Sequence, residues 1–217
     1  AILVWNEMAF ALLNRMVRDF DWAANALEAR DYNRFEELES IFRKYGERYG
    51  FEHYLIAAQG YQESRLNQSA RSRSGAVGIM QVKPSTARGK NVGIRDINTV
   101  DGNIHAGVKY LSFIRERYFS DAEINEVNRN LLSLAAYNMG PARMLKVRDK
   151  AAAAGYDPNI WFDNVELAAA RNVGGEPVRY VGNIYTYSLS YSLSSEQLSK
   201  RRDVRQRAGI EQAGVTP

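Results

Sequence analysis

The segment Tyr54–Leu66 constrains the fold more than any other part of the chain. It has the length and composition of a helix, and its first half, Tyr54–Ala58, carries an apolar or aromatic residue at every position. A helix on a protein surface has one apolar face and one polar face, whereas a helix that is apolar all round has to be covered on every side. The sequence therefore predicts a buried central helix with other elements packed around it.

The end of this helix carries Glu63, a residue that needs a chemical explanation. A carboxylate at the end of a buried helix is costly unless it is paired or used. The negative end of the helix dipole and apolar neighbours both raise the pKa of such a carboxyl group. We therefore expect Glu63 to stay protonated near neutral pH, as a general acid requires. Considered alone, the residue is more simply interpreted as a solvated carboxylate at a fraying helix end, because most glutamates are solvated.

A polar loop that contains Gly75 and Gly78 follows the helix and ends in Ile79, Met80 and Gln81. Glycines allow tight turns and close approach of the backbone to other groups, and the Gln81 amide can both donate and accept hydrogen bonds. We expect this loop to fold back over the end of the helix and to form one wall of a cleft that contains Glu63. A simple turn would be the alternative interpretation.

The remaining chain shows further helical patterns and no strand pattern longer than a few residues. The sequence thus predicts an all-α fold with at most a very small β-ribbon. Glycines at 46 and 50 mark a break before the central helix. We expect residues 1–44 to form an N-terminal helical extension or a linker from a preceding domain, residues 45–193 to form the main domain, and residues 194–217 to form a basic C-terminal helix or tail.

A helix predicted over residues 121–138 places Val127, Leu131 and Leu134 on its apolar stripe. The next position of that stripe is Asn138, so a polar side chain points where apolar ones point, with Tyr137 beside it. Asn138 is therefore either a residue of a polar site or a cap of the helix C-terminus.

Composition excludes several classes of site. There are 29 Lys and Arg against 25 Asp and Glu, a net charge of +4 that suits an anionic polymer or a membrane surface. No basic module with interleaved aromatics indicates nucleic-acid binding. The absence of cysteine excludes disulfides and thiolate metal sites, and His53 and His105 lack the spacing of a zinc site. Asp96 and Asp101 do not match a calcium loop, and Asp101 is better explained as a helix N-cap. We expect no metal and no cofactor.

Four short motifs stand in order along the chain: Glu63-Ser64, Gly78–Gln81, Ala135–Gly140 and Glu176–Val181. Together they resemble the soluble lytic transglycosylase family, whose catalytic domain is similar to goose-type lysozyme. The resemblance covers roughly residues 45–191. The amino-acid sequence around the motifs is most similar to a membrane-bound branch of this family. In that branch a domain resembling periplasmic solute-binding proteins precedes the catalytic module.

The resemblance implies a lysozyme-like fold in which Glu63 is the single catalytic acid and base. It implies substrate-binding roles for Ser64, Met80, Gln81, Tyr137, Asn138, Glu176 and Tyr180. Within this set, Met80 and Gln81 are expected to line the cleft and contact the sugars, and Ser64 to support the bound substrate. Tyr137 and Asn138 are expected near Glu63, with Tyr180 completing the wall.

The activity implied by the resemblance is non-hydrolytic cleavage of the β-1,4 bond between N-acetylmuramic acid and N-acetylglucosamine, with a 1,6-anhydromuramoyl product. The implied partners are peptidoglycan glycan strands and a preceding solute-binding-like domain of the same protein, with no nucleic acid, in a monomer. The implied location is the periplasm of a Gram-negative bacterium, with attachment to its outer membrane. Two alternatives stay open: a hydrolytic muramidase, which needs a second carboxylate, and a non-catalytic peptidoglycan-binding module.

Overall fold

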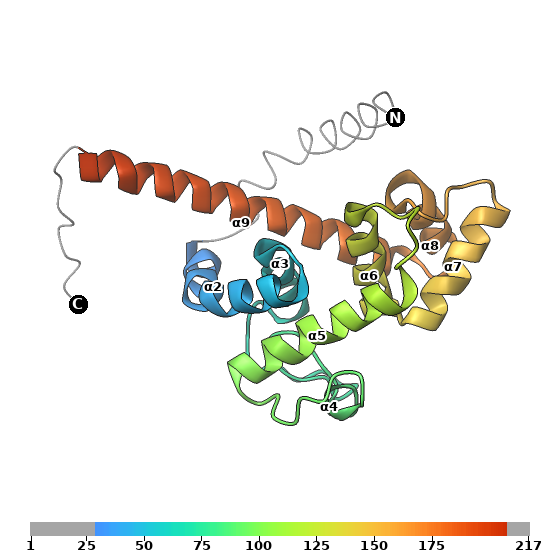
Figure 1. The fold of residues 1–217 in the computed structure, drawn as a ribbon, viewed down its shortest axis with the longest axis horizontal. Helices are drawn as coiled ribbons and strands as arrows, with labels where there is room; N and C mark the ends of the chain where they lie inside the picture. The colour runs from blue at the N-terminus through green and yellow to red at the C-terminus, as the bar shows by residue number, and fades with distance from the viewer. Residues whose placement is uncertain (1–28, 208–217) are drawn as a thin grey trace.

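The computed structural model describes residues 29–207, and it is built from helices (Figure 1). In chain order these are α2 (Ala29–Tyr49), α3 (His53–Ser64), α4 (Pro84–Arg88), α5 (Val100–Tyr118), α6 (Glu126–Met139), α7 (Pro141–Ala153), the π-helical turn η1 (Trp161–Val165), α8 (Glu166–Asn172) and α9 (Gly175–Arg207). In the described part of the chain, β structure is limited to two isolated bridges, Arg71 with Val77 and Val77 with Val82. The predicted all-α fold is confirmed.

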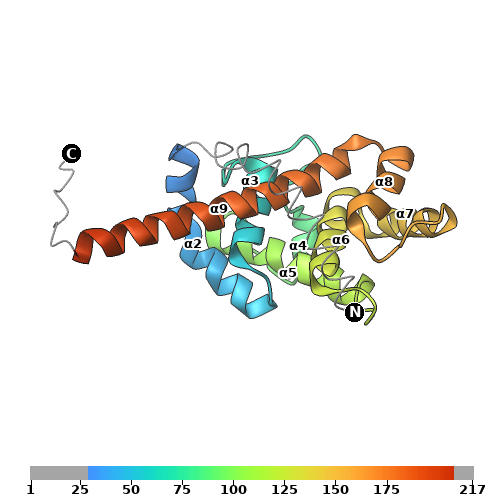
Figure 2. The same cartoon turned by 90° about the horizontal axis from the view of Figure 1, so that it is seen from above.

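Helix α3 occupies the centre of the fold, as its uniformly apolar start requires. Its residues from Leu55 to Tyr61 are all buried. Helices α2 and α9 both pack against α3, and α9 also contacts α6 and α8. Figure 2 shows α9 passing over α3 as a single long helix. Helix α3 is therefore enclosed by elements from both ends of the described chain.

Helix α3 ends one residue after Glu63, because Arg65 and Leu66 adopt left-handed backbone conformations with φ of 55° and 58°. The Arg65 N–H donates to the carbonyl of Tyr61 at 2.8 Å, and the side chain of Leu66 is buried. Left-handed backbone is uncommon for residues other than glycine. Burial of Leu66 helps to offset that cost, and the sharp exit turns the following loop back toward the helix.

Helix α2 crosses the predicted boundary at residue 44 without a break, and its side chains Phe35, Leu38 and Phe42 are buried in the common core. Likewise, α9 continues beyond residue 194 to Arg207. The division of the chain at these two positions stays a prediction.

Asp101 is not the N-cap that the sequence predicted. Helix α5 starts at Val100, and its cap is Thr99, whose hydroxyl oxygen accepts from the Gly102 N–H at 3.2 Å. The Asp101 carboxylate instead accepts hydrogen bonds from Lys44 Nζ (2.9 Å) and Tyr45 Oη (2.7 Å). Its position in the first turn lets it tie α5 to α2.

The predicted helix over residues 121–138 begins later than expected. Its N-cap is Asn125, whose side chain accepts from the Asn128 N–H at 2.9 Å. The placement of Val127 on the apolar stripe is wrong, because this side chain is 47% exposed. Asn128 faces the interior instead, where its Oδ1 accepts from the Trp161 N–H at 2.9 Å. The stripe toward the core contains Leu131 and Leu134, as predicted.

Candidate active site

Glu63 lies at the edge of a cleft of about 490 Å³. The α3 helix delivers the side chain from its last turn, where it is partly buried. The cleft walls come from the loop before α4, from the middle of α5 and from the junction of α6 and α7; they include Gln81, Lys83, Tyr110, Tyr137, Asn138 and Gly140. In the described part of the chain, Glu63 is the one acidic residue that lines this cleft.

The surroundings of Glu63 raise the pKa of its carboxyl group from 4.5 to about 7. Burial is the main cause, because it disfavours the charged form. The hydrogen bond that Tyr180 Oη donates to Glu63 Oε1 at 2.6 Å lowers this pKa, and the negative charge of Glu176 raises it again. Glu63 can therefore hold or release a proton near neutral pH, as the sequence predicted.

Tyr180 reaches Glu63 from the second turn of α9 and is itself buried. Burial and the neighbouring Glu63 charge raise the pKa of Tyr180 well above its ordinary value, so the hydroxyl keeps its proton. The side chain of Gln59, fully buried within α3, donates to the Tyr180 oxygen at 3.4 Å. These contacts fix the direction of the hydroxyl toward the carboxylate.

Tyr137 and Asn138, at the end of α6, line the cleft as expected. The Tyr137 hydroxyl donates to the Met80 carbonyl oxygen at 2.8 Å, so it holds the loop against α6. Asn138 Nδ2 donates to Glu176 Oε1 at 2.8 Å, which joins the end of α6 to the start of α9. Glu176 itself is exposed and lies outside the lining of the cleft.

Gln81 lines the cleft from the loop, in a left-handed conformation with φ of 44°. Its Nε2 donates to the Gly78 carbonyl at 2.9 Å, which stabilises the turn that presents it. This residue also occupies the position predicted for it.

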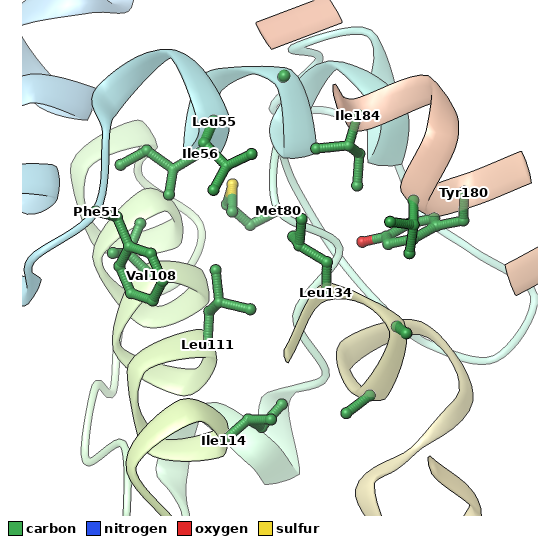
Figure 3. Packing of buried hydrophobic residues seen from close by; sticks show 14 of the residues in the cluster. Phe51, Leu55, Ile56, Met80, Val108, Leu111, Ile114, Leu134, Tyr180 and Ile184 are labelled. Carbon is green, nitrogen blue, oxygen red and sulfur yellow. The ribbon is translucent and has the colours of Figure 1, made fainter. Parts of the chain in front are cut away.

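Met80 does not line the cleft, contrary to the prediction. Its side chain is fully buried, and Figure 3 shows it in the core between α3 and α5. Glycines on both helices make the space: a β-carbon on Gly107 would lie 2.4 Å from Met80 Cβ, and one on Gly60 would lie 3.3 Å from Met80 Sδ. Met80 therefore anchors the loop beneath the cleft, where its side chain cannot contact a sugar.

Ser64 also has a different environment from the one expected. Its hydroxyl donates to the Ile79 carbonyl oxygen at 2.9 Å and accepts from the Asn67 N–H at 3.0 Å. The residue does not line the cleft. Its hydrogen bonds connect the end of α3 to the loop.

Asn103, on α5, is the main site residue that sequence reasoning missed. It is fully buried, its Oδ1 accepts from the Met80 N–H at 2.8 Å, and its Nδ2 donates to the Val77 carbonyl at 2.9 Å and the Ile97 carbonyl at 3.1 Å. Gly78 lies directly against it, since a β-carbon there would lie 2.3 Å from Nδ2. The available signal was a polar residue one helical turn before Gly107, on a face that continues to Leu111.

Within the described residues, no group of three or more His, Asp or Glu side chains is arranged to hold a metal ion. Nor is any helix in that part of the chain long and apolar enough to cross a bilayer.

Comparison with known proteins agrees with this geometry. The family model described as the transglycosylase SLT domain matches residues 40–160. The chain belongs to the transglycosylase SLT domain family. The resemblance inferred from the four motifs is confirmed.

A relative in Desulfosudis oleivorans, named membrane-bound lytic murein transglycosylase F, is 35% identical over 185 residues, which cover 79% of this chain and 40% of the relative. The chain thus spans less than half the length of this transglycosylase SLT relative.

Two solved structures support the assignment of the fold. The 70 kDa soluble lytic transglycosylase from Escherichia coli has a TM-score of 0.55 at 23% identity, and the match covers 72% of this chain and 24% of that one. An inactive mutant of lytic transglycosylase Slt from Pseudomonas aeruginosa has a TM-score of 0.53 at 24% identity over the same shares. The transglycosylase SLT fold is therefore present in this chain.

Proposed function

We propose that this chain is the catalytic module of a peptidoglycan lytic transglycosylase. It cleaves the β-1,4 bond between N-acetylmuramic acid and N-acetylglucosamine without water and leaves a 1,6-anhydromuramoyl end. The observation that carries this proposal is a single carboxyl group, Glu63, with a pKa of about 7 in a cleft that has no second acidic residue in its described lining. A hydrolytic muramidase would need a further carboxylate to activate water.

The mechanism uses Glu63 twice. The protonated carboxyl gives its proton to the bridging oxygen, and the bond from that oxygen to C1 of the muramic acid breaks. The acetamido group of the same sugar supports the positive charge at C1. The Glu63 carboxylate then takes the proton from the C6 hydroxyl, and that oxygen bonds to C1 to close the anhydro ring. Because the nucleophile belongs to the substrate, positioning supplies much of the reduction in barrier.

The chain's other residues position these steps. Tyr180 donates to the Glu63 carboxylate, so it stabilises the charged form between the two proton transfers. Tyr137 and Tyr110 present aromatic surface to the cleft, with ring centroids 5.2 Å apart, which suits the apolar face of a sugar. Gln81 and Asn138 offer polar groups to the cleft, one from the loop and the other from the end of α6.

The cellular setting is also part of the proposal. A location in the periplasm, with attachment to the outer membrane, is consistent with the name of the Desulfosudis oleivorans relative. A preceding domain, similar to solute-binding proteins, is consistent with the greater length of that relative. We propose that the module acts on glycan strands as a monomer.

The product identifies the reaction. Purified peptidoglycan digested by the protein is expected to release muropeptides that are lighter by one water than those released by a hydrolytic muramidase, because ring closure consumes no water. Mass spectrometry of the digest checks this, with a lysozyme digest as the control. Products with ordinary reducing ends would refute the proposed reaction and favour the hydrolytic alternative.

Tyr180→Phe is expected to shift the pH dependence of activity. The lost hydrogen bond is the influence that lowers the Glu63 pKa, so this pKa rises above about 7 and the alkaline limb of the profile moves to higher pH. Initial rates of muropeptide release across pH measure the shift. Tyr187→Phe is the control, since Tyr187 lies on the same helix and packs its ring on Tyr61. An unchanged alkaline limb in Tyr180→Phe would contradict the role of Glu63 as the titrating acid.

A further inference from the structure

A second hollow, of about 240 Å³, lies on the surface of α7. Arg143, Lys146 and Lys150 line it from α7, at spacings of three and four residues that place them on one face of the helix. Asn172 and Val173, at the end of α8, form its opposite side, and the buried Val147 lies at its base. The hollow therefore combines three exposed cationic side chains with a rigid base.

The three positive charges of this hollow are not neutralised within the described part of the chain. None of them lies within 4.0 Å of a described carboxylate oxygen, and Lys150 Nζ donates to the neutral Asn172 Oδ1 at 2.7 Å. Arg148, on another face of α7, is by contrast occupied by Asn159 (2.6 Å) and Asp121 (3.9 Å). Like charges at this spacing repel each other, and a bound anion would relieve that repulsion.

The nearby acidic residues do not line the hollow. Asp149 lies three residues after Lys146 and is its neighbour on the surface of α7, but it does not line the hollow. Glu176, in the first turn of α9, is bound to Asn138. The surface around Arg143, Lys146 and Lys150 is thus a local concentration of positive charge.

The hollow begins within one helical turn of a residue that lines the cleft. Met139 and Gly140 line the cleft, α7 begins at the next residue, and Arg143 is the third residue after Gly140. At a rise of 1.5 Å per residue, the cationic face from Arg143 to Lys150 extends about 10 Å further along α7. A polymer that lies in the cleft and leaves it across Gly140 would pass along these side chains.

We propose that Arg143, Lys146 and Lys150 bind the carboxylates of stem peptides on the glycan strand that occupies the cleft. This inference rests on the proposed function, because it takes the occupant of the cleft to be peptidoglycan. The stem peptides are the anionic parts of that polymer that project from the sugars, and guanidinium and ammonium groups are suited to carboxylates. The hollow would thus favour strands that carry peptides over bare glycan.

The test compares a triple variant, Arg143→Gln with Lys146→Gln and Lys150→Gln, with the unchanged protein. Binding to insoluble peptidoglycan is measured by co-sedimentation, with intact material and with material whose stem peptides have been removed by an amidase. A control triple variant, Lys90→Gln with Arg95→Gln and Arg117→Gln, makes the same change of charge at exposed positions outside both hollows.

We expect the α7 variant to bind intact peptidoglycan about tenfold more weakly at low salt, and to match the unchanged protein on peptide-free glycan. The difference on intact material should shrink in about 0.5 M salt, because exposed charges are screened. Equal losses by both triple variants, an equal loss on peptide-free glycan, or no loss would each overturn the inference. The readout is binding, so a failure of the anhydro-product assay would separately overturn the proposed function.

Discussion

Glu63→Gln is expected to lower the rate of anhydromuropeptide release by about 10²–10⁴-fold, the range that a general acid typically supplies. Glutamine keeps the size of the side chain and can still accept the hydrogen bond from Tyr180. It cannot give a proton to the bridging oxygen or take one from the C6 hydroxyl. The rate of product release by the purified variant, measured at a saturating amount of peptidoglycan, checks this expectation.

Glu47→Gln, on the exposed surface of α2, is the matched control and should retain full activity. A Glu63→Gln protein with a rate within about tenfold of the unchanged protein would remove Glu63 from the mechanism.

Thermal unfolding separates a loss of chemistry from a loss of fold in Glu63→Gln. A carboxyl whose pKa is raised from 4.5 to about 7 contributes stability that is fully present below the lower value and is lost as the pH rises through the higher one. Glutamine stays neutral at every pH. The variant should therefore melt at a higher temperature than the unchanged protein at about pH 8, while it remains inactive.

Asn103→Ala is expected to destabilise the protein by about 2–3 kcal/mol, because it leaves the buried Met80 N–H without a partner and removes one of the two donors to each of the Val77 and Ile97 carbonyls, which keep the Val82 N–H and Gln68 Nε2. For a domain of this size the melting temperature should fall by on the order of 10 °C. The loop that presents Gln81 loses its connection to α5 by the same change, so activity should decline with stability. Thermal denaturation and product release measure the two effects.

Asn98→Ala provides the comparison for Asn103→Ala. Asn98 is exposed, five residues earlier, and its hydrogen bonds with Gln68 and Asp96 use its backbone atoms. We expect its effect to stay within about 0.5 kcal/mol. A small loss of stability in Asn103→Ala, similar to that of Asn98→Ala, would contradict the clamping role of the Asn103 side chain.

The sequence predicted the fold class and the central helix well, because both depend on the pattern of apolar residues. A run such as Tyr54–Ala58 can only be satisfied by burial on all sides. Helix ends were less predictable. The left-handed turn at Arg65 and Leu66 uses residues that do not favour it, so local propensity gives no signal for the end of α3. The start of α6 was misplaced because Asn125 and Asp121 are both acceptable caps.

The sequence predicted which segments form the candidate site better than it predicted where their side chains point. The motifs predicted that Glu63, Gln81 and Tyr137 lie in one cleft, and all three line it. They could not tell which side of the loop backbone faces the cleft, and so the side chain of Met80 was assigned to substrate when it belongs to the core. Asn103 was missed because its partners are backbone atoms of the loop, which leave no complementary residue type to find in the sequence.

Met80 packs against two glycines, and this packing sets how deeply the loop above it sits between α3 and α5. Gly60 on α3 and Gly107 on α5 bring both helix backbones close to the same side chain, which carries the loop above it. A β-carbon at Gly107 would lie 2.4 Å from Met80 Cβ, so a larger residue there requires α5 or the loop to shift. A change in the size of the residue at position 107 is therefore expected to alter the core and the floor of the cleft together.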